Sequence, residues 1–366
     1  VGVAASGVMI VLPYYFHGYK PFKHMVIFGE FMAIAAVIMC LGFIVVDIGQ
    51  PQRMLNVLLY PTPNSILFWD MVVLNGYLIL NLICGWISLQ YDRMNMPHPK
   101  WIKPVVYTSI IWAFSIHTVT AFLYQGLPGR HYWLTAILAA RFLASAFCSG
   151  PAILLLVMML TEKLTTYKMP KRGVMTLAKI ITYAMCVNVF FFLLEIFTAF
   201  YSGIPGHQHS IAYLFVGSHG HHELVPWMWT AAVFAIVSLV LLVPPHLRNC
   251  RKLLPWSLVI LVVATWIDKG LGLLIGGFTP TPFETITTYW PTWQELMISL
   301  MIYATGALVV TVLFKVATDV KAERNMSQDV GCGCNTEEVK AGECCCAETA
   351  EEPEEAEGET PAEAPA

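Results

Sequence analysis

Residues 47–70 read DIGQPQRMLNVLLYPTPNSILFWD and join two long apolar runs of the chain. This segment contains an arginine, two asparagines and three prolines, and it is flanked by Asp47 and Asp70. Runs of about 20 apolar residues are long enough to cross the roughly 30 Å hydrocarbon core of a bilayer. We therefore expect the segment to be a polar loop at a membrane boundary, between two membrane-spanning helices.

The composition of the whole chain supports this interpretation. Of 366 residues, 57% are hydrophobic and 12% are charged, whereas an average soluble domain has roughly 25% charged residues. Proline and glycine separate apolar runs at 1–16, 25–46, 66–90, 104–124, 132–160, 175–200, 224–243, 256–277 and 294–316. The sequence predicts an all-α polytopic membrane protein with nine visible spans in residues 1–320. Because the chain begins inside an apolar run, we expect upstream sequence with at least one further helix.

The basic residues are distributed unequally between the two sides of these spans. Alternating the loops assigns 17 of the 21 Lys and Arg residues to one side and only Arg53 and Arg130 to the other. Cytoplasmic loops of membrane proteins are enriched in Lys and Arg. The sequence therefore predicts a protein of the cytoplasmic (inner) membrane with a cytoplasmic C-terminus, and it places the loop of residues 47–70 on the outer face.

The composition changes again in residues 321–366, which are rich in Glu, Ala and Pro. Highly charged segments with few bulky apolar residues tend to remain disordered, so we expect an acidic, cysteine-rich cytoplasmic tail without a fold. Its cysteines match no standard zinc or iron–sulfur spacing, and we favour a low-complexity tail over a metal site. They are Cys332, Cys334, Cys344, Cys345 and Cys346.

Ionisable residues of the spans gather towards the outer face. Charges inside a membrane are costly and are candidates for function. Those at or near the outer ends are Asp47, Asp70, His117, Arg141, Glu195, Asp268, Lys269 and Glu295. The inner half offers only Glu30 and the boundary residue Glu162. Such a set is compatible with ion pairs that pack helices together, but we favour a cavity that binds a polar headgroup and exchanges protons.

A quinone needs a site of the second kind, with an apolar cleft, donors for two oxygens and a group that exchanges protons. His117 is the candidate for proton exchange, because the reference pKa of histidine, about 6.5, allows both protonation states. A haem b needs two axial ligands, and His117 is the only histidine deep in a predicted span. We therefore expect no haem in this chain.

The predicted outer loop between residues 201 and 223 holds five histidines. Their spacing has no clear metal-site pattern, and we favour proton carriers over a metal ion. They are His207, His209, His219, His221 and His222. In the first outer loop, Arg53 and Asn64 are also compatible with simple local capping of a helix.

Several segments of the chain resemble the NrfD/PsrC family of membrane quinone-reactive subunits, and the likeness extends over about residues 1–316. They are DIGQPQRMLN (47–56), PNSILFWD (63–70), SIHTVTAFLY (115–124), ARFLASAFCSGPAILLL (140–156), NVFFFLLEIFTAFYSG (188–203) and TYWPTWQE (288–295). Segments 213–231 and 266–282 look most like the DsrP-type members of Dsr-type complexes.

The resemblance implies a fold of two four-helix bundles with a pseudo-twofold relation plus extra helices, with ten spans in the full-length chain. It implies menaquinone or another quinone bound near the outer face, and no haem or iron–sulfur cluster in this chain. Implied partners are a ferredoxin-like iron–sulfur subunit on the outer face, a multihaem cytochrome c and other membrane and cytoplasmic subunits. The implied activity is quinone-linked electron transfer in dissimilatory sulfite or sulfur metabolism. No nucleic acid partner is implied.

The resemblance also assigns roles to single residues. Asp47 and Arg53 match the family's D-x-G-x-P-x-R loop, His117 its S-x-H-T helix, Glu195 its E-x-F helix and Glu295 the acid after its Y-x-P-T turn. Gln50 and Gln52 depart from it, because charged residues are frequent there.

From the residues and the resemblance together we expect two groups of functional side chains. His117, Asp47, Asp70 and Glu195 would manage protons. His117, Arg141, Asp268, Lys269, Arg53 and Glu295 would hold the quinone. Two other hypotheses remain open, namely a transporter or proton channel that uses the same buried charges, and a passive membrane anchor.

Overall fold

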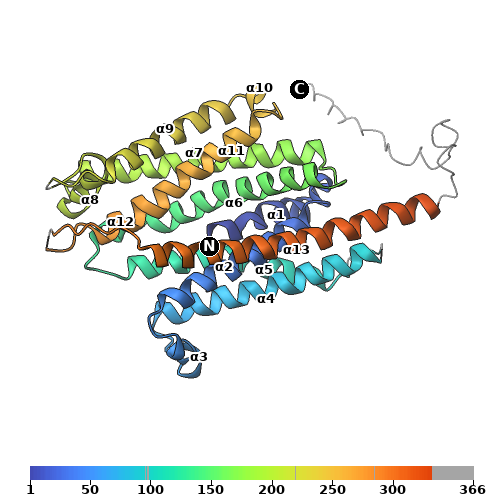
Figure 1. Ribbon diagram of the computed structural model, residues 1–366, viewed down its shortest axis with the longest axis horizontal. Helices are drawn as coiled ribbons and strands as arrows, with labels where there is room; N and C mark the ends of the chain where they lie inside the picture. Colours follow the sequence, from blue (N-terminus) through green and yellow to red (C-terminus); the bar gives the residue numbers. More distant parts are fainter. Residues whose placement is uncertain (95, 97–98, 219, 284, 332–366) are drawn as a thin grey trace, which may run out of the picture.

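The computed structural model describes residues 1–331 except residues 95, 97, 98, 219 and 284. Within these residues, eight helical segments are long and apolar enough to cross a membrane, and they lie roughly side by side (Figure 1). They are α2 (Val26–Asp47), α4 (Ile66–Arg93), α5 (Ile102–Gln125), α6 (Ile137–Leu164), α7 (Lys171–Tyr201), α9 (Val225–Leu242), the composite span Leu254–Phe278, and α13 (Trp293–Gly331).

The first predicted span is a shorter apolar segment, made of η1 (Gly2–Ser6) and α1 (Val8–His17). The all-α polytopic fold is therefore confirmed. The cysteines of the predicted tail lie outside the described residues.

Short elements cap the two ends of the helical layer. α3 (Asn56–Leu59), α8 (Pro205–Phe215) and α12 (Leu274–Phe278) lie at one end, and α10 (Pro245–Arg248) follows the opposite end of α9 (Figure 1). The loops predicted to be outer therefore share one end of the molecule. The remaining short turns are η2 (Lys20–Phe22), η3 (Pro51–Arg53) and η4 (His131–Trp133).

Helix α6 lies at the centre of the packing. The η1–α1 segment lies between α2, α5 and α6, while α6, α7, α9 and α11 (Leu254–Trp266) form a second group. Small residues allow the first group to pack closely, since a Cβ atom on Gly29 would lie 3.0 Å from the backbone of Gly7. The pseudo-twofold relation between bundles stays a prediction.

The composite span departs from regular α-helix in its C-terminal half. Between α11 and α12, residues Ile267–Leu273 form a π-helical segment, η5, a geometry found frequently at functional sites. The buried indole of Trp133 braces its end, because Trp133 Nε1 donates a hydrogen bond to the carbonyl oxygen of Leu273 at 2.8 Å. Gly277 makes room for the ring, since a Cβ atom there would overlap the indole.

Replacing Trp133 by Phe should destabilise this corner. The change removes the indole hydrogen bond to the buried Leu273 carbonyl, a contribution of about 0.5–1.5 kcal/mol, and we expect a lower thermal unfolding midpoint for the purified protein. Trp229→Phe is the matched control, because Trp229 Nε1 also donates to a carbonyl, that of Phe215 at 3.0 Å, but its side chain is 55% exposed. Equal effects of both changes would contradict the bracing role.

Candidate functional site

A cavity of about 300 Å³ lies between η1, α5, α6 and the composite span. Its polar wall residues are His117 and Tyr124 from α5, Ser145 and Ser149 from α6, Thr265 from α11, and Lys269 from η5. Apolar side chains form the rest of its wall, among them Phe142, Val262, Trp266, Leu273 and Leu274. An apolar pocket with a few converging polar groups is the usual form of a small-molecule site.

His117 is buried in the wall of this cavity with one ring nitrogen unused. Its Nδ1 atom lies 2.9 Å from the carbonyl oxygen of Ala113. Because a carbonyl only accepts, Nδ1 carries the hydrogen in the neutral ring, and Nε2 is left as an acceptor. Within the described residues Nε2 is buried and has no hydrogen-bond partner. His117 is therefore poised to accept a hydrogen bond or a proton from a molecule in the cavity.

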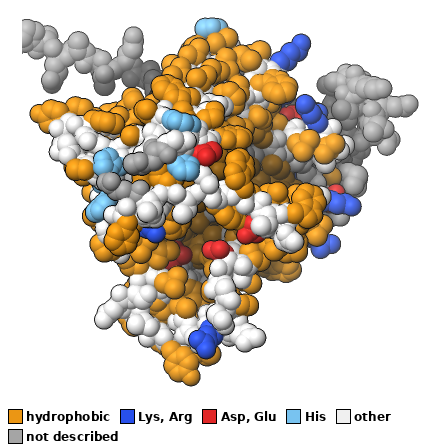
Figure 2. Space-filling model, turned by 60° about the vertical axis from the view of Figure 1, so that its left-hand side comes forward, with side chains coloured by type: hydrophobic (Ala, Val, Ile, Leu, Met, Phe, Trp, Pro, Cys, Tyr) orange, Lys and Arg blue, Asp and Glu red, His pale blue; other side chains and the backbone are white. Residues whose placement is uncertain are grey.

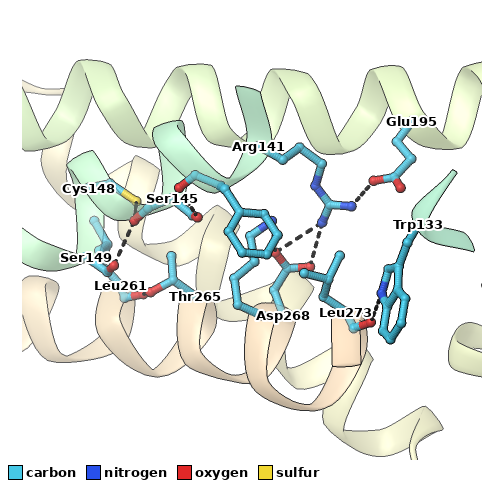
Figure 3. A network of polar contacts seen from close by, with 12 residues as sticks. Trp133, Arg141, Ser145, Cys148, Ser149, Glu195, Leu261, Thr265, Asp268 and Leu273 are labelled. Carbon is cyan, nitrogen blue, oxygen red and sulfur yellow. Dashed lines mark hydrogen bonds and ion pairs between the residues drawn. The ribbon is translucent and has the colours of Figure 1, made fainter. Parts of the chain in front are cut away.

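A network of buried and half-buried charges lies beside the cavity (Figure 3). Arg141 of α6 forms an ion pair with Glu195 of α7, and its Nη2 atom donates to both carboxylate oxygens of Asp268 at 3.2 and 3.3 Å. Lys269 Nζ lies 3.7 Å from the same Asp268 carboxylate. Two cations and two carboxylates balance, so the network joins α6, α7 and η5 without a net charge in the membrane.

Asp268 and Lys269, which are neighbours in the π-helical segment, line two different cavities. Lys269 lines the cavity of His117, whereas Asp268 lines a smaller one of about 130 Å³ between α7, α9 and α11. Thr265 contributes to both walls. The charge network therefore lies between the two cavities.

Asp70 is buried beside the same stretch of α5. The hydroxyl of Thr120 donates to Asp70 Oδ1 at 2.8 Å and lies 2.7 Å from the carbonyl oxygen of Ile116. Because Thr120 follows His117 by three residues on α5, Asp70 is tied to the same part of that helix. Asp70 does not line the cavity itself.

Asp47, Arg53 and Glu295 are exposed and lie outside the lining of the cavity. Figure 2 views this end of the molecule, where acidic side chains gather around the hollowed middle of the face and histidines lie to one side. Glu295 instead caps α13, because Glu295 Oε2 accepts a hydrogen bond from the backbone N–H of Thr292 at 2.7 Å. Its own N–H donates to Thr292 Oγ1 at 3.4 Å, which completes a capping box.

This capping arrangement predicts a purely structural effect at Glu295. Glu295→Ala should slightly lower the thermal unfolding midpoint and leave the turnover predicted from the sequence unchanged, because the carboxylate holds a helix end outside the cavity. Glu295→Gln is the matched variant, since glutamine also closes a capping box. A loss of turnover in the glutamine variant would instead favour the quinone-binding role predicted from the sequence.

The cavity also contains side chains that the sequence did not single out. Tyr124 follows His117 by two helical turns on one face of α5, and Ser145 and Ser149 follow Arg141 at four-residue intervals on α6. These spacings place them on the faces that carry the predicted residues. Their helical spacing from His117 and Arg141 was the signal in the sequence that could have identified them.

The histidines of the predicted outer loop do not form a metal site among the described residues, where no group of three or more His, Cys, Asp or Glu side chains is arranged to hold a metal ion. His207 is buried in α8. His221 Nδ1 lies 3.5 Å from Glu223, and His222 Nδ1 lies 3.1 Å from the Val216 carbonyl oxygen. His219 lies outside the described residues.

Comparison with known proteins relates the chain to a family of membrane subunits. The chain is similar to a protein of Halobacterium salinarum described as a putative membrane subunit of dimethyl sulfoxide reductase, with 23% identity over 85% of this chain and 78% of the relative. It is also similar to the Hdr-like menaquinol oxidoreductase integral membrane subunit of Archaeoglobus fulgidus, with 22% identity over 66% of this chain and 59% of the relative. It is similar as well to the menaquinone reductase integral membrane subunit of Nitratidesulfovibrio vulgaris, with 24% identity over 74% of this chain and 69% of the relative.

A family model described as "Polysulphide reductase, NrfD" matches residues 1–280, which is well over half of the chain. The match includes every element that lines the cavity beside His117. The chain therefore belongs to the polysulphide reductase NrfD family of integral membrane proteins.

Proposed function

We propose that this protein is the quinone-reactive membrane subunit of an electron-transfer complex, and that the cavity beside His117 receives the quinone ring. One observation carries the proposal. Two buried polar atoms in the wall of one largely apolar cavity, His117 Nε2 and Lys269 Nζ, have no hydrogen-bond partner within the described residues. Buried polar groups are normally paired, so both favour a ligand with polar oxygens.

The residues of the cavity fit a quinone. The volume of about 300 Å³ lies at the lower end of the range of small-molecule sites, and the side chains of Phe142, Trp266 and Leu274 offer apolar contact to a ring or tail. A bound quinone would supply the redox chemistry, because it takes up or releases two electrons and two protons. The names of two relatives, a menaquinol oxidoreductase and a menaquinone reductase, favour menaquinone.

The chain's own residues would manage the protons. His117, held by Ala113 in the tautomer with a free Nε2, accepts a proton from a quinol hydroxyl and returns it in the reverse reaction. Lys269 donates a hydrogen bond to an oxygen in the cavity. Arg141 forms ion pairs with Glu195 and Asp268 beside it. We assign to Asp70 and Glu195 the passage of protons towards the outer face.

The outer loops would provide the docking surface for partner subunits. We infer a ferredoxin-like iron–sulfur partner on this face, because electrons from the cavity need an acceptor at the same end of the molecule. The unequal distribution of Lys and Arg supports insertion in the cytoplasmic membrane with the C-terminus inside. Segments 213–231 and 266–282 support a DsrP-type subunit with a multihaem cytochrome c in its complex and a role in sulfur metabolism.

Photolabelling of the purified complex with an azidoquinone tests the proposed site. We expect the label on peptides of α5, α6 or the composite span Leu254–Phe278, because these elements form the cavity. Excess unlabelled menaquinone should abolish the labelling. If only other spans are labelled, the quinone binds outside this cavity. If the complex contains no extractable quinone and shows no specific labelling, the protein is a passive membrane anchor.

A further inference from the structure

A second large hollow, of about 700 Å³, lies at the opposite end of α7 from the candidate site. It opens between the first half of α7 and the corner where α9 meets α10. Three cations, Arg172, Lys179 and Arg248, line it, and its lining contains no Asp or Glu. Arg172 and Glu195 lie about 35 Å apart along α7 at 1.5 Å per residue, so this groove is separate from the charge network.

One face of α7 changes from basic to apolar along the groove. Arg172, Thr176, Lys179, Tyr183 and Cys186 line it, and their spacing of four and three residues places them on a single stripe of the helix. The cations lie in the first turns of α7, and the stripe continues as Tyr183 and Cys186 towards the middle of the membrane-spanning segment. A ligand that follows this stripe needs an anionic end and an apolar end.

Arg248 is held in place on the other wall. Its Nη1 atom donates to the carbonyl oxygen of Leu242 at 3.0 Å at the end of α9. Its Nε atom is buried and has no hydrogen-bond partner within the described residues. A guanidinium fixed in this way offers further N–H groups to a phosphate.

Arg172 and Lys179 are exposed, and no ion pair or hydrogen bond occupies either side chain in the part of the chain that the structure describes. Zwitterionic lipids carry an ammonium group that would find no carboxylate in this lining. Basic pockets between membrane helices are typical sites for anionic lipid headgroups.

We propose that this groove binds an anionic phospholipid from the leaflet at the basic end of the protein. The phosphate contacts Arg172, Lys179 and Arg248, and an acyl chain lies along Tyr183 and Cys186. The proposal is independent of quinone chemistry in the cavity beside His117.

Native mass spectrometry of the purified complex with added phosphatidylglycerol or phosphatidylcholine tests the proposal. We expect preferential retention of phosphatidylglycerol, and a loss of about tenfold in its affinity in the Arg172→Gln/Lys179→Gln variant, because each cation near a membrane surface contributes several-fold to lipid binding. Both side chains are exposed, so this variant should fold.

Lys100→Gln/Lys103→Gln is the matched control, since it removes two exposed cations at the same end but outside the groove. It should retain phosphatidylglycerol like the unchanged protein. Equal retention of the two lipids, or unchanged phosphatidylglycerol binding in Arg172→Gln/Lys179→Gln, would overturn the proposal. Displacement of the lipid by millimolar inorganic phosphate would also overturn it, because the groove would then be a site for a free anion.

Discussion

Replacing His117 by Gln is expected to lower quinol-linked turnover of the assembled complex by about 10²-fold or more, the usual contribution of a general acid or base. Glutamine has a similar length and keeps hydrogen-bonding atoms in the wall of the cavity, but it does not titrate. The neutral ring offers Nε2 to the cavity because Nδ1 is engaged by the Ala113 carbonyl oxygen. Turnover should therefore fall while quinone photolabelling persists.

His207→Gln provides the matched control. His207 is also buried, with 8% of its surface exposed, but it belongs to α8 and does not line the cavity. Both variants need the same assembly and thermal stability as the unchanged complex before their rates are compared. If His117→Gln retains nearly full turnover, or if His207→Gln loses as much, His117 is not the proton acceptor.

The depth of the functional residues could be predicted from the sequence because the length of the apolar runs sets it. Apolar runs of about 20 residues fix where each helix enters and leaves the membrane. Eight of the nine predicted spans correspond to helices long enough to cross it, and the first, residues 1–16, is a shorter apolar segment. That reasoning places Asp47, His117, Arg141, Glu195 and Glu295 near one end.

Which of these residues meet depends on how each helix is rotated about its axis. A membrane helix that is apolar on all sides gives no sequence pattern from which that rotation can be predicted. Arg141 and Asp268 are brought together although 127 residues separate them, whereas Glu295 faces outward and caps its own helix. Asp268 and Lys269 lie in a π-helical segment whose end accepts a hydrogen bond from Trp133, a contact that no local sequence pattern specifies.

Arg141→Met should be strongly destabilising, although it roughly keeps the length of the side chain. Arg141 is fully buried and compensates both Glu195 and Asp268. Its loss leaves two carboxylates with only Lys269, and an uncompensated buried charge costs about 3–5 kcal/mol. We expect a low yield of assembled complex and a strongly decreased thermal unfolding midpoint. Arg130→Met is the control, because Arg130 donates to the Phe278 carbonyl oxygen at 2.7 Å in an exposed position.

A second substitution separates lost charge balance from lost packing. In Arg141→Met/Glu195→Gln, only Asp268 and Lys269 remain charged and the network is again neutral, so most of the lost stability should return. The rescue should be specific to the pair, because contacting charges couple whereas distant sites add. If the double variant is no more stable than Arg141→Met, the guanidinium acts through packing against the Phe192 ring, 5.3 Å away, and not through charge. If Arg141→Met is as stable as Arg130→Met, the charge network does not stabilise the site.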